Sequence, residues 1–116
     1  MIKPLFPVWR RERYLDALTN NKRYIPRPAW REEYYLARLA GLDVPVPKAV
    51  TLREMYYSKM LGIGETAPKY KPEYPRIFAF LARAAGQDIQ LPRAETREQR
   101  YWLEYIRQKG IKKNES

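Results

Sequence analysis

The feature that most constrains this chain is an aromatic residue that recurs every 21 to 24 positions. The recurring aromatics, called anchors here, are Tyr14, Tyr35, Tyr56, Phe80 and Tyr101. The residues that directly follow them are all large and apolar or aromatic: Leu15, Leu36, Tyr57, Leu81 and Trp102. A period of this length is typical of repeat proteins, in which one unit cannot bury its apolar face alone. The chain is therefore expected to contain five copies of one short unit.

Each unit begins with residues that favour a helix N-terminus. In the third unit Thr51 precedes Glu54 by three residues, the spacing of a capping box, in which each side chain satisfies a free backbone N–H. The fifth unit repeats this pattern, the first two units carry tryptophan at the cap, and proline starts the fourth, where its missing N–H is no loss. The cap residues in chain order are Trp9, Trp30, Thr51, Pro75 and Thr96.

The ends of the units and the segments between them also repeat. Six residues after the anchor stand residues that favour the left-handed stop of a helix, namely Asn20, Gly41, Gly62 and Gly86. Nine residues before it, prolines recur at Pro26, Pro47 and Pro92. Proline pushes the residue before it out of the helical region, so these connectors are expected to be extended. The predicted helical units lie near residues 9–20, 30–41, 51–62, 75–86 and 96–109, with a basic tail at 107–116.

These features predict an all-α protein with a single repeat region over residues 1–116. Its five single-helix repeats of about 21–24 residues could stack into a small solenoid, each helix covering the next. Alternatively, the chain could be strung over a larger partner and become ordered on binding. Eight extended residues reach roughly 25 Å, which is more than a tight turn needs. An elongated or loosely packed chain is therefore expected rather than a compact core.

The anchors and the residues after them form an apolar stripe on each helix, with charged residues opposite. Arginine stands four residues before the anchor in four units, and this spacing predicts a guanidinium stacked on the anchor ring of the same helix. The stripe residues are interpreted as packing or partner-docking anchors. The alternative, that the tyrosines stack on nucleobases, is disfavoured because they share a face with leucine.

The charge distribution points to anionic partners. The chain carries a net charge of +10 and has dense basic stretches at "WRRER" and "RQKGIKK". Clustered arginine and lysine are sufficient for phosphate binding, although a solvated helix face and tail would have the same composition. The candidate phosphate contacts are Arg10, Arg11, Arg13, Lys109, Lys112 and Lys113.

Several kinds of site are not expected. Cysteine and histidine are absent, which excludes disulfides and thiolate or imidazole metal sites. Glu32 and Glu33 are consecutive and point about 100° apart on a helix, so they predict a cap and a surface charge rather than an acid–base pair. No catalytic, cofactor-binding or metal-binding residues are proposed. No apolar run approaches the roughly 20 residues that span a bilayer, and no signal peptide is recognised, so a cytoplasmic product is expected.

Three stretches carry a resemblance to a known family: "RPAWREEYYLARLAGLDVPVP", "PVPKAVTLREMYYSKMLG" and "IQLPRAETREQRYWLEYI". Their pattern resembles a short repeat of threonine-arginine-x-glutamate-x-tyrosine-leucine type, spaced by glycine and proline-rich segments. That repeat occurs in head-fibre and accessory proteins of tailed-bacteriophage particles. The chain departs from it in its tryptophan caps and in its divergent fourth unit.

The resemblance implies a virion component made in the host cytoplasm, such as a capsid accessory or adaptor protein of the head, neck or fibre base. Its partners would be larger virion proteins (capsid, portal or neck, or fibre), engaged in several copies through repeated helix docking. The alternative is a basic nucleic-acid-associated protein, bound to a ribosome or a genome. No membrane partner and no enzymatic activity are expected.

Overall fold

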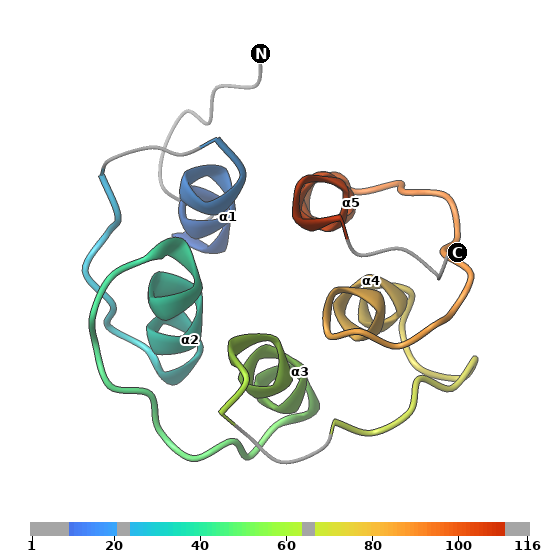
Figure 1. Cartoon of the computed structure of the whole chain (residues 1–116), viewed down its shortest axis with the longest axis horizontal. Coiled ribbons are helices and arrows are strands. Elements are labelled where there is room, and N and C mark those ends of the chain that lie inside the picture. Colours follow the sequence, from blue (N-terminus) through green and yellow to red (C-terminus); the bar gives the residue numbers. More distant parts are fainter. Residues whose placement is uncertain (1–9, 21–23, 64–66, 111–116) are drawn as a thin grey trace.

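The computed structural model describes residues 10–20, 24–63 and 67–110, which form five α-helices arranged in a ring (Figure 1). The helices are α1 (Arg10–Asn20), α2 (Arg31–Ala40), α3 (Leu52–Leu61), α4 (Ile77–Ala84) and α5 (Arg97–Lys109). No strand occurs within these ranges. The prediction of an all-α chain with one helix per repeat is therefore confirmed.

The two predicted capping boxes are present. The backbone N–H of Glu54 donates to Thr51 Oγ1 at 3.1 Å, and the N–H of Thr51 donates to the Glu54 carboxylate at 3.3 Å. Thr96 forms the same box at the start of α5. Trp30 stands at the N-cap of α2 but makes no side-chain capping hydrogen bond. Trp9 lies outside the described residues.

The helix ends follow the sequence prediction at most positions. Gly41, directly after α2, has a φ of 114°, which an L-residue rarely adopts, and the predicted stop glycines after α3 and α4 also have positive φ. Gly110 ends α5 in the same way, although the sequence analysis did not single it out. Asn20 is instead the last residue of α1. Pro75 lies two residues before α4, which begins at Ile77. The carbonyl of Pro75 accepts the backbone N–H of Phe78, and this tight turn leads into the helix.

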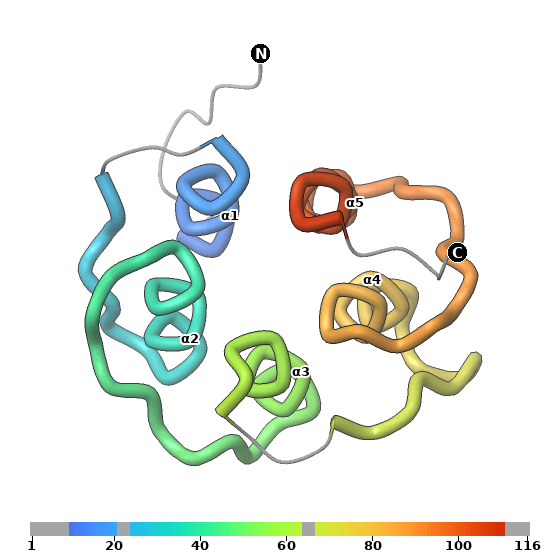
Figure 2. The backbone as a smooth tube through the Cα atoms, in the orientation of Figure 1, coloured from blue at the N-terminus to red at the C-terminus, as the bar shows by residue number. Residues whose placement is uncertain are grey.

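The five helices run parallel. Arg10 at the start of α1 pairs with Glu33 in the first turn of α2, so the two N-termini lie side by side. At the opposite end, Gln108 of α5 donates to the carbonyl of Thr19 in α1 at 2.6 Å. Each connector therefore returns from the C-terminus of one helix to the N-terminus of the next, and the described parts of the connectors run along the outside of the ring (Figure 2).

The expectation of an elongated or loosely packed chain is wrong. The described residues measure 36 × 33 × 28 Å, and α5 packs against α1 as well as α4, which closes the ring. The connectors are longer than a tight turn between stacked helices needs, but parallel helices require that length. A ten-residue helix is about 15 Å long, and the chain must travel back over that length before the next parallel helix can start.

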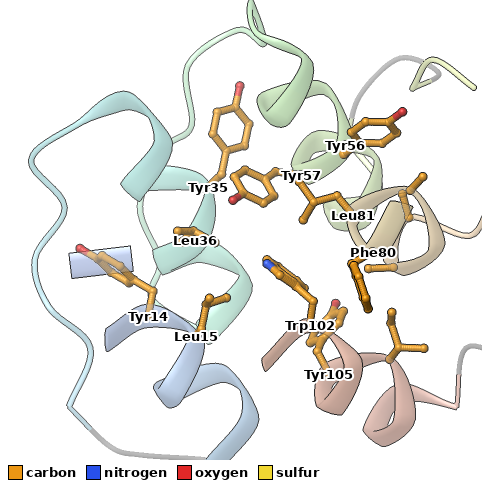
Figure 3. Packing of buried hydrophobic residues seen from close by; sticks show 14 of the residues in the cluster. Tyr14, Leu15, Tyr35, Leu36, Tyr56, Tyr57, Phe80, Leu81, Trp102 and Tyr105 are labelled. Atoms are coloured by element: carbon orange, nitrogen blue, oxygen red, sulfur yellow. The ribbon is translucent and has the colours of Figure 1, made fainter. Parts of the chain in front are cut away.

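The core lies where the five apolar stripes meet (Figure 3). The residues that follow the anchors are at most 1% exposed: Leu15, Leu36, Tyr57, Leu81 and Trp102. The ring of Trp102 stacks on Tyr57 with 5.9 Å between centroids and meets the edge of Tyr105 at 5.3 Å. The chain thus covers each stripe with its own neighbouring helices, without a partner.

Candidate functional site

The anchors are packing residues. Four of the five have no exposed surface, and Tyr101 is partly buried against the same core. Tyr14 donates its hydroxyl to the carbonyl of Pro26 at 2.9 Å, and Tyr56 donates to Pro68 at 2.9 Å. Burial raises the pKa of Tyr14 and of Tyr56 to about 12, so both hydroxyls stay protonated and tie the connector to its helix. Their burial excludes base stacking in this structure.

The repeated arginine joins each unit to the next, and the predicted stacking on its own anchor ring is wrong. Arg10 donates through Nε and Nη2 to the carboxylate of Glu33 at 2.6 and 2.8 Å, and also to the carbonyl of Arg27 at 3.0 Å. Arg31 makes the same bidentate contact with Glu54. The guanidinium reaches across the helix interface because a buried carboxylate is a stronger partner than a ring face. We call this arrangement the inter-repeat clasp.

A clasp with a single hydrogen bond closes the ring, because the Nε of Arg97 has no partner among the described atoms. Arg97, the first residue of α5, donates to Glu12 of α1 at 2.6 Å, although the two residues are 85 positions apart. The Glu12 side chain is 4% exposed, and its second oxygen has no partner among the described atoms. The equivalent oxygens of Glu33 and Glu54 each accept the backbone N–H of the residue four positions earlier. The residue four positions before Glu12 is Val8, which lies outside the described residues.

The junction between α3 and α4 replaces both members of the clasp. The arginine position is Leu52 and the glutamate position is Phe78, so an ion pair gives way to an apolar pair. Both residues pack against the core. Phe78 lies 6.0 Å from the ring of Tyr56, and Arg53 sits over its face at 5.8 Å. At this junction both charged positions of the clasp are therefore occupied by apolar residues.

The junction between α4 and α5 keeps the arginine but has glutamine in place of glutamate. Gln99 accepts the N–H groups of Glu95 and Thr96 at 2.7 and 3.2 Å, so it caps α5 as the glutamates cap their helices. Arg76 still reaches the carbonyl of Arg93 at 3.2 Å, and it lies 3.8 Å from the exposed carboxylate of Glu95. The residue two positions before the anchor can therefore cap its helix without forming an ion pair with the preceding unit.

A second set of charged residues lies on the inner side of the ring. Each stands four residues, or about one helical turn, before the buried residue that follows an anchor. Arg11 pairs with Glu32 at 2.5 Å and with Glu98 at 3.1 Å, and Arg53 pairs with Glu98 at 2.6 Å. The hydroxyl of Tyr57 lies 3.0 Å from Arg53 and bonds to Glu32 at 3.5 Å. These residues join α1, α2, α3 and α5. The interpretation of Glu32 as a mere surface charge is wrong, because its partners come from other helices.

The clasps change the ionisation of the carboxylates that they hold. Burial opposes ionisation of Glu33, but the hydrogen bonds from Arg10 and from the backbone N–H of Ala29 outweigh it and lower its pKa. Glu54 has its pKa lowered for the same reasons, with Arg31 as its arginine. Both carboxylates are therefore charged at neutral pH and add to the cohesion of the ring.

The four candidate phosphate contacts within the described residues do not form one cluster. Arg10 and Arg11 are held in the ion pairs described above. Arg13 is exposed on α1, and Lys109 is exposed at the end of α5, where its ammonium lies 5.6 Å from the ring of Tyr105. Lys112 and Lys113 lie outside the described residues. The site that the sequence analysis expected at "WRRER" is therefore largely an internal interface.

The structure instead places exposed basic residues at the end of the ring where the helices begin, which we call the N-terminal face; the exposed carboxylate of Glu95 lies there as well. Arg27, Lys48 and Arg93 recur there one residue after a connector proline, and all three side chains are exposed. Trp30 is 65% exposed on the same face, as is Val50. This surface was not predicted from the sequence, although the recurring proline-basic pair and the tryptophan at a cap position were visible signals.

Within the described residues, no group of three or more potential ligands could hold a metal ion, and no helix is long and apolar enough to cross a membrane. Comparison with protein-family models, with curated proteins and with solved structures finds no match for this chain.

Proposed function

We propose that this chain is a non-enzymatic structural component of a tailed-bacteriophage particle, an accessory or adaptor protein that binds larger virion proteins of the head, neck or fibre base. The observation that carries the proposal is that the ring satisfies its own apolar stripes and clasps. It is therefore a preformed rigid body, and a partner would meet its outer surface rather than open helices. The resemblance of its repeats to those of phage head-fibre and accessory proteins supports the particle as the setting.

Rigidity is the property that suits an adaptor. The clasp recurs at three of the five junctions, and at a fourth both of its charged members are replaced by apolar residues that pack against the core. A preformed surface binds without the entropic cost of ordering a chain, so a small contact area is used efficiently. This replaces the earlier expectation of helices docking one by one, since the residues needed for that mode are buried.

A second candidate function is a nucleic-acid-associated protein, and the exterior charge favours it. The pairs that Arg10, Arg11, Arg31, Arg53 and Arg97 form with five glutamates balance each other. The net charge of +10 is therefore carried by residues outside these pairs. A basic exterior attracts polyanions, and such binding weakens steeply with salt.

Mass spectrometry of purified particles tests the two candidates. Particles from the source are measured before and after nuclease digestion and a high-salt wash. Retention through both treatments is the expected result for a protein of the shell. Loss with the nuclease or the salt would favour the second candidate, and absence from the untreated particles would refute the proposal.

A further inference from the structure

The start of α2 departs from the repeat in a way that the fold does not require. Thr51 and Thr96 complete capping boxes at the equivalent position, and Glu33 stands ready as the third residue of such a box in α2. Trp30 occupies the cap, makes no capping hydrogen bond and is 65% exposed. Its indole thus takes the place of a stabilising threonine and contributes little to the core.

The surroundings of Trp30 are basic and partly apolar. The neighbouring Arg31 side chain is 50% exposed and reaches the carbonyl of Lys48 on the next connector, which brings the two units together. Val50, two residues further on, is 65% exposed, and Arg27 lies exposed just before Trp30. The carboxylates of Glu33 and Glu54, which cap the two helices that start here, are buried in their clasps.

We propose that this sector of the N-terminal face, formed by Arg27, Trp30, Arg31, Lys48 and Val50, docks an acidic segment of another protein that carries at least one large apolar side chain. An exposed tryptophan with arginine beside it has the composition of an interface hot spot. Acidic groups on the partner would complement Arg27 and Lys48, since the charge of Arg31 is already balanced by Glu54. The inference names the partner chemistry of the proposed function and rests on it.

A protein segment fits this sector better than a nucleic acid. Val50 has an aliphatic side chain, which can pack against an apolar residue but offers no aromatic face for a base. The sector combines two exposed apolar side chains, Trp30 and Val50, with exposed cationic side chains at Arg27 and Lys48. That combination is common in protein–protein contacts.

The substitution Trp30→Thr separates binding from folding. Threonine restores the box that Thr51 forms with Glu54, so this variant should melt about 4 °C higher than the wild type. The same variant should lose docking. Tyr24→Ser is the matched control, because Tyr24 is another exposed aromatic residue, at 71% exposure, outside this sector.

Two probes identify the ligand class in solution: a synthetic peptide of alternating aspartate and leucine, and a single-stranded oligothymidine. Each is titrated into the full-length, isotopically labelled chain at physiological salt and followed by NMR. The peptide is expected to shift the indole N–H of Trp30 and the amides of Arg27 to Arg31 and of Lys48 to Val50. Trp30→Thr should weaken its binding at least about tenfold, and Tyr24→Ser should leave it unchanged. Binding of the oligothymidine alone to this sector, or of neither probe, would overturn the proposal.

Particle incorporation separates failure of this inference from failure of the proposed function. If the wild type is present in particles and Trp30→Thr is depleted despite its higher melting temperature, the docking sector is supported. Wild-type incorporation of Trp30→Thr would overturn the sector and leave the particle function standing. If the wild type itself is absent from particles, the proposed function fails, and the peptide titration still decides the chemistry of the sector.

Discussion

The substitution Glu33→Gln tests the clasp at a single atom pair. Glutamine can still accept the N–H of Ala29 through its carbonyl oxygen, as Gln99 does at the start of α5, so the helix cap survives. What is lost is the charged bidentate bond from Arg10. A hydrogen bond to a charged group contributes about 1.5–3 kcal/mol, and solvent screening reduces this because the Arg10 side chain is 35% exposed. We expect a loss of about 1 kcal/mol in the free energy of unfolding.

Urea unfolding followed by circular dichroism at neutral pH measures this loss. With a slope of roughly 1.5 kcal/mol per molar, the midpoint of Glu33→Gln should fall by about 0.7 M at an unchanged slope. Glu33→Ala removes the cap as well and should lose about 2 kcal/mol. Glu104→Gln is the matched control, because Glu104 is 44% exposed and lies 3.8 Å from Arg107, and it should leave the midpoint unchanged.

Two results would refute this reasoning. Glu33→Gln could unfold within about 0.3 kcal/mol of the wild type, in which case the clasp adds nothing to stability. Alternatively, it could lose as much as Glu33→Ala, in which case glutamine does not preserve the cap. The pH dependence is a further check, since the difference between the wild type and Glu33→Gln should shrink as the pH falls through the lowered pKa of Glu33.

Three further predictions concern the anchors, acid stability and a helix end. Phe80→Tyr adds a hydroxyl near the carbonyl of Pro92, twelve residues on as in the tyrosine units, and should stabilise by up to about 1 kcal/mol in urea unfolding. The stabilisation from Glu33 and Glu54 is complete above about pH 4.3 and is lost as the pH falls through their lowered pKa values, so circular dichroism should show acid unfolding, and constant stability down to pH 2 would contradict this. Gly41→Ala meets no atom within 4 Å but must adopt a φ of 114°, so its melting curve should show a loss of about 1–2 kcal/mol from backbone strain alone.

The helices could be predicted from the sequence because their signals are local. A capping box spans four residues, as between Thr51 and Glu54, and a stop glycine such as Gly41 acts within one turn. The sequence also marked Tyr35 and Leu36 as packing or partner-docking residues, but it left open which of the two roles they have. These parts of the prediction depended on residues that are neighbours in the chain.

The ring itself depended on pairs that local spacing does not reveal. Arginine four residues before one anchor meets glutamate two residues before the next, so Arg10 finds Glu33 at a separation of 23 residues. A reading confined to single helices assigned that arginine to its own tyrosine. Leu52 and Phe78 also indicate that these two positions pair, because the arginine and the glutamate are replaced at the same junction.

The docking sector was missed for a different reason. Trp30 was treated as a variant cap, and its exposure becomes evident once the connectors are placed outside the ring. Sequence can show that a cap residue is unusual, but it cannot show which way an uncapped side chain faces. Arg27 and Lys48 lie 21 residues apart in the sequence, whereas the parallel helices bring their connectors to one face.

The closing clasp between Arg97 and Glu12 also bears on how such a protein could change in evolution. A chain of stacked repeats with free ends can gain or lose a copy, and its length drifts while its function persists. A ring whose last unit binds its first has a copy number fixed by geometry. Duplication or deletion of one segment would change the angle at which neighbouring helices must pack for the last unit to meet the first. Divergence is therefore expected within the units, as the fourth already shows, rather than in their number.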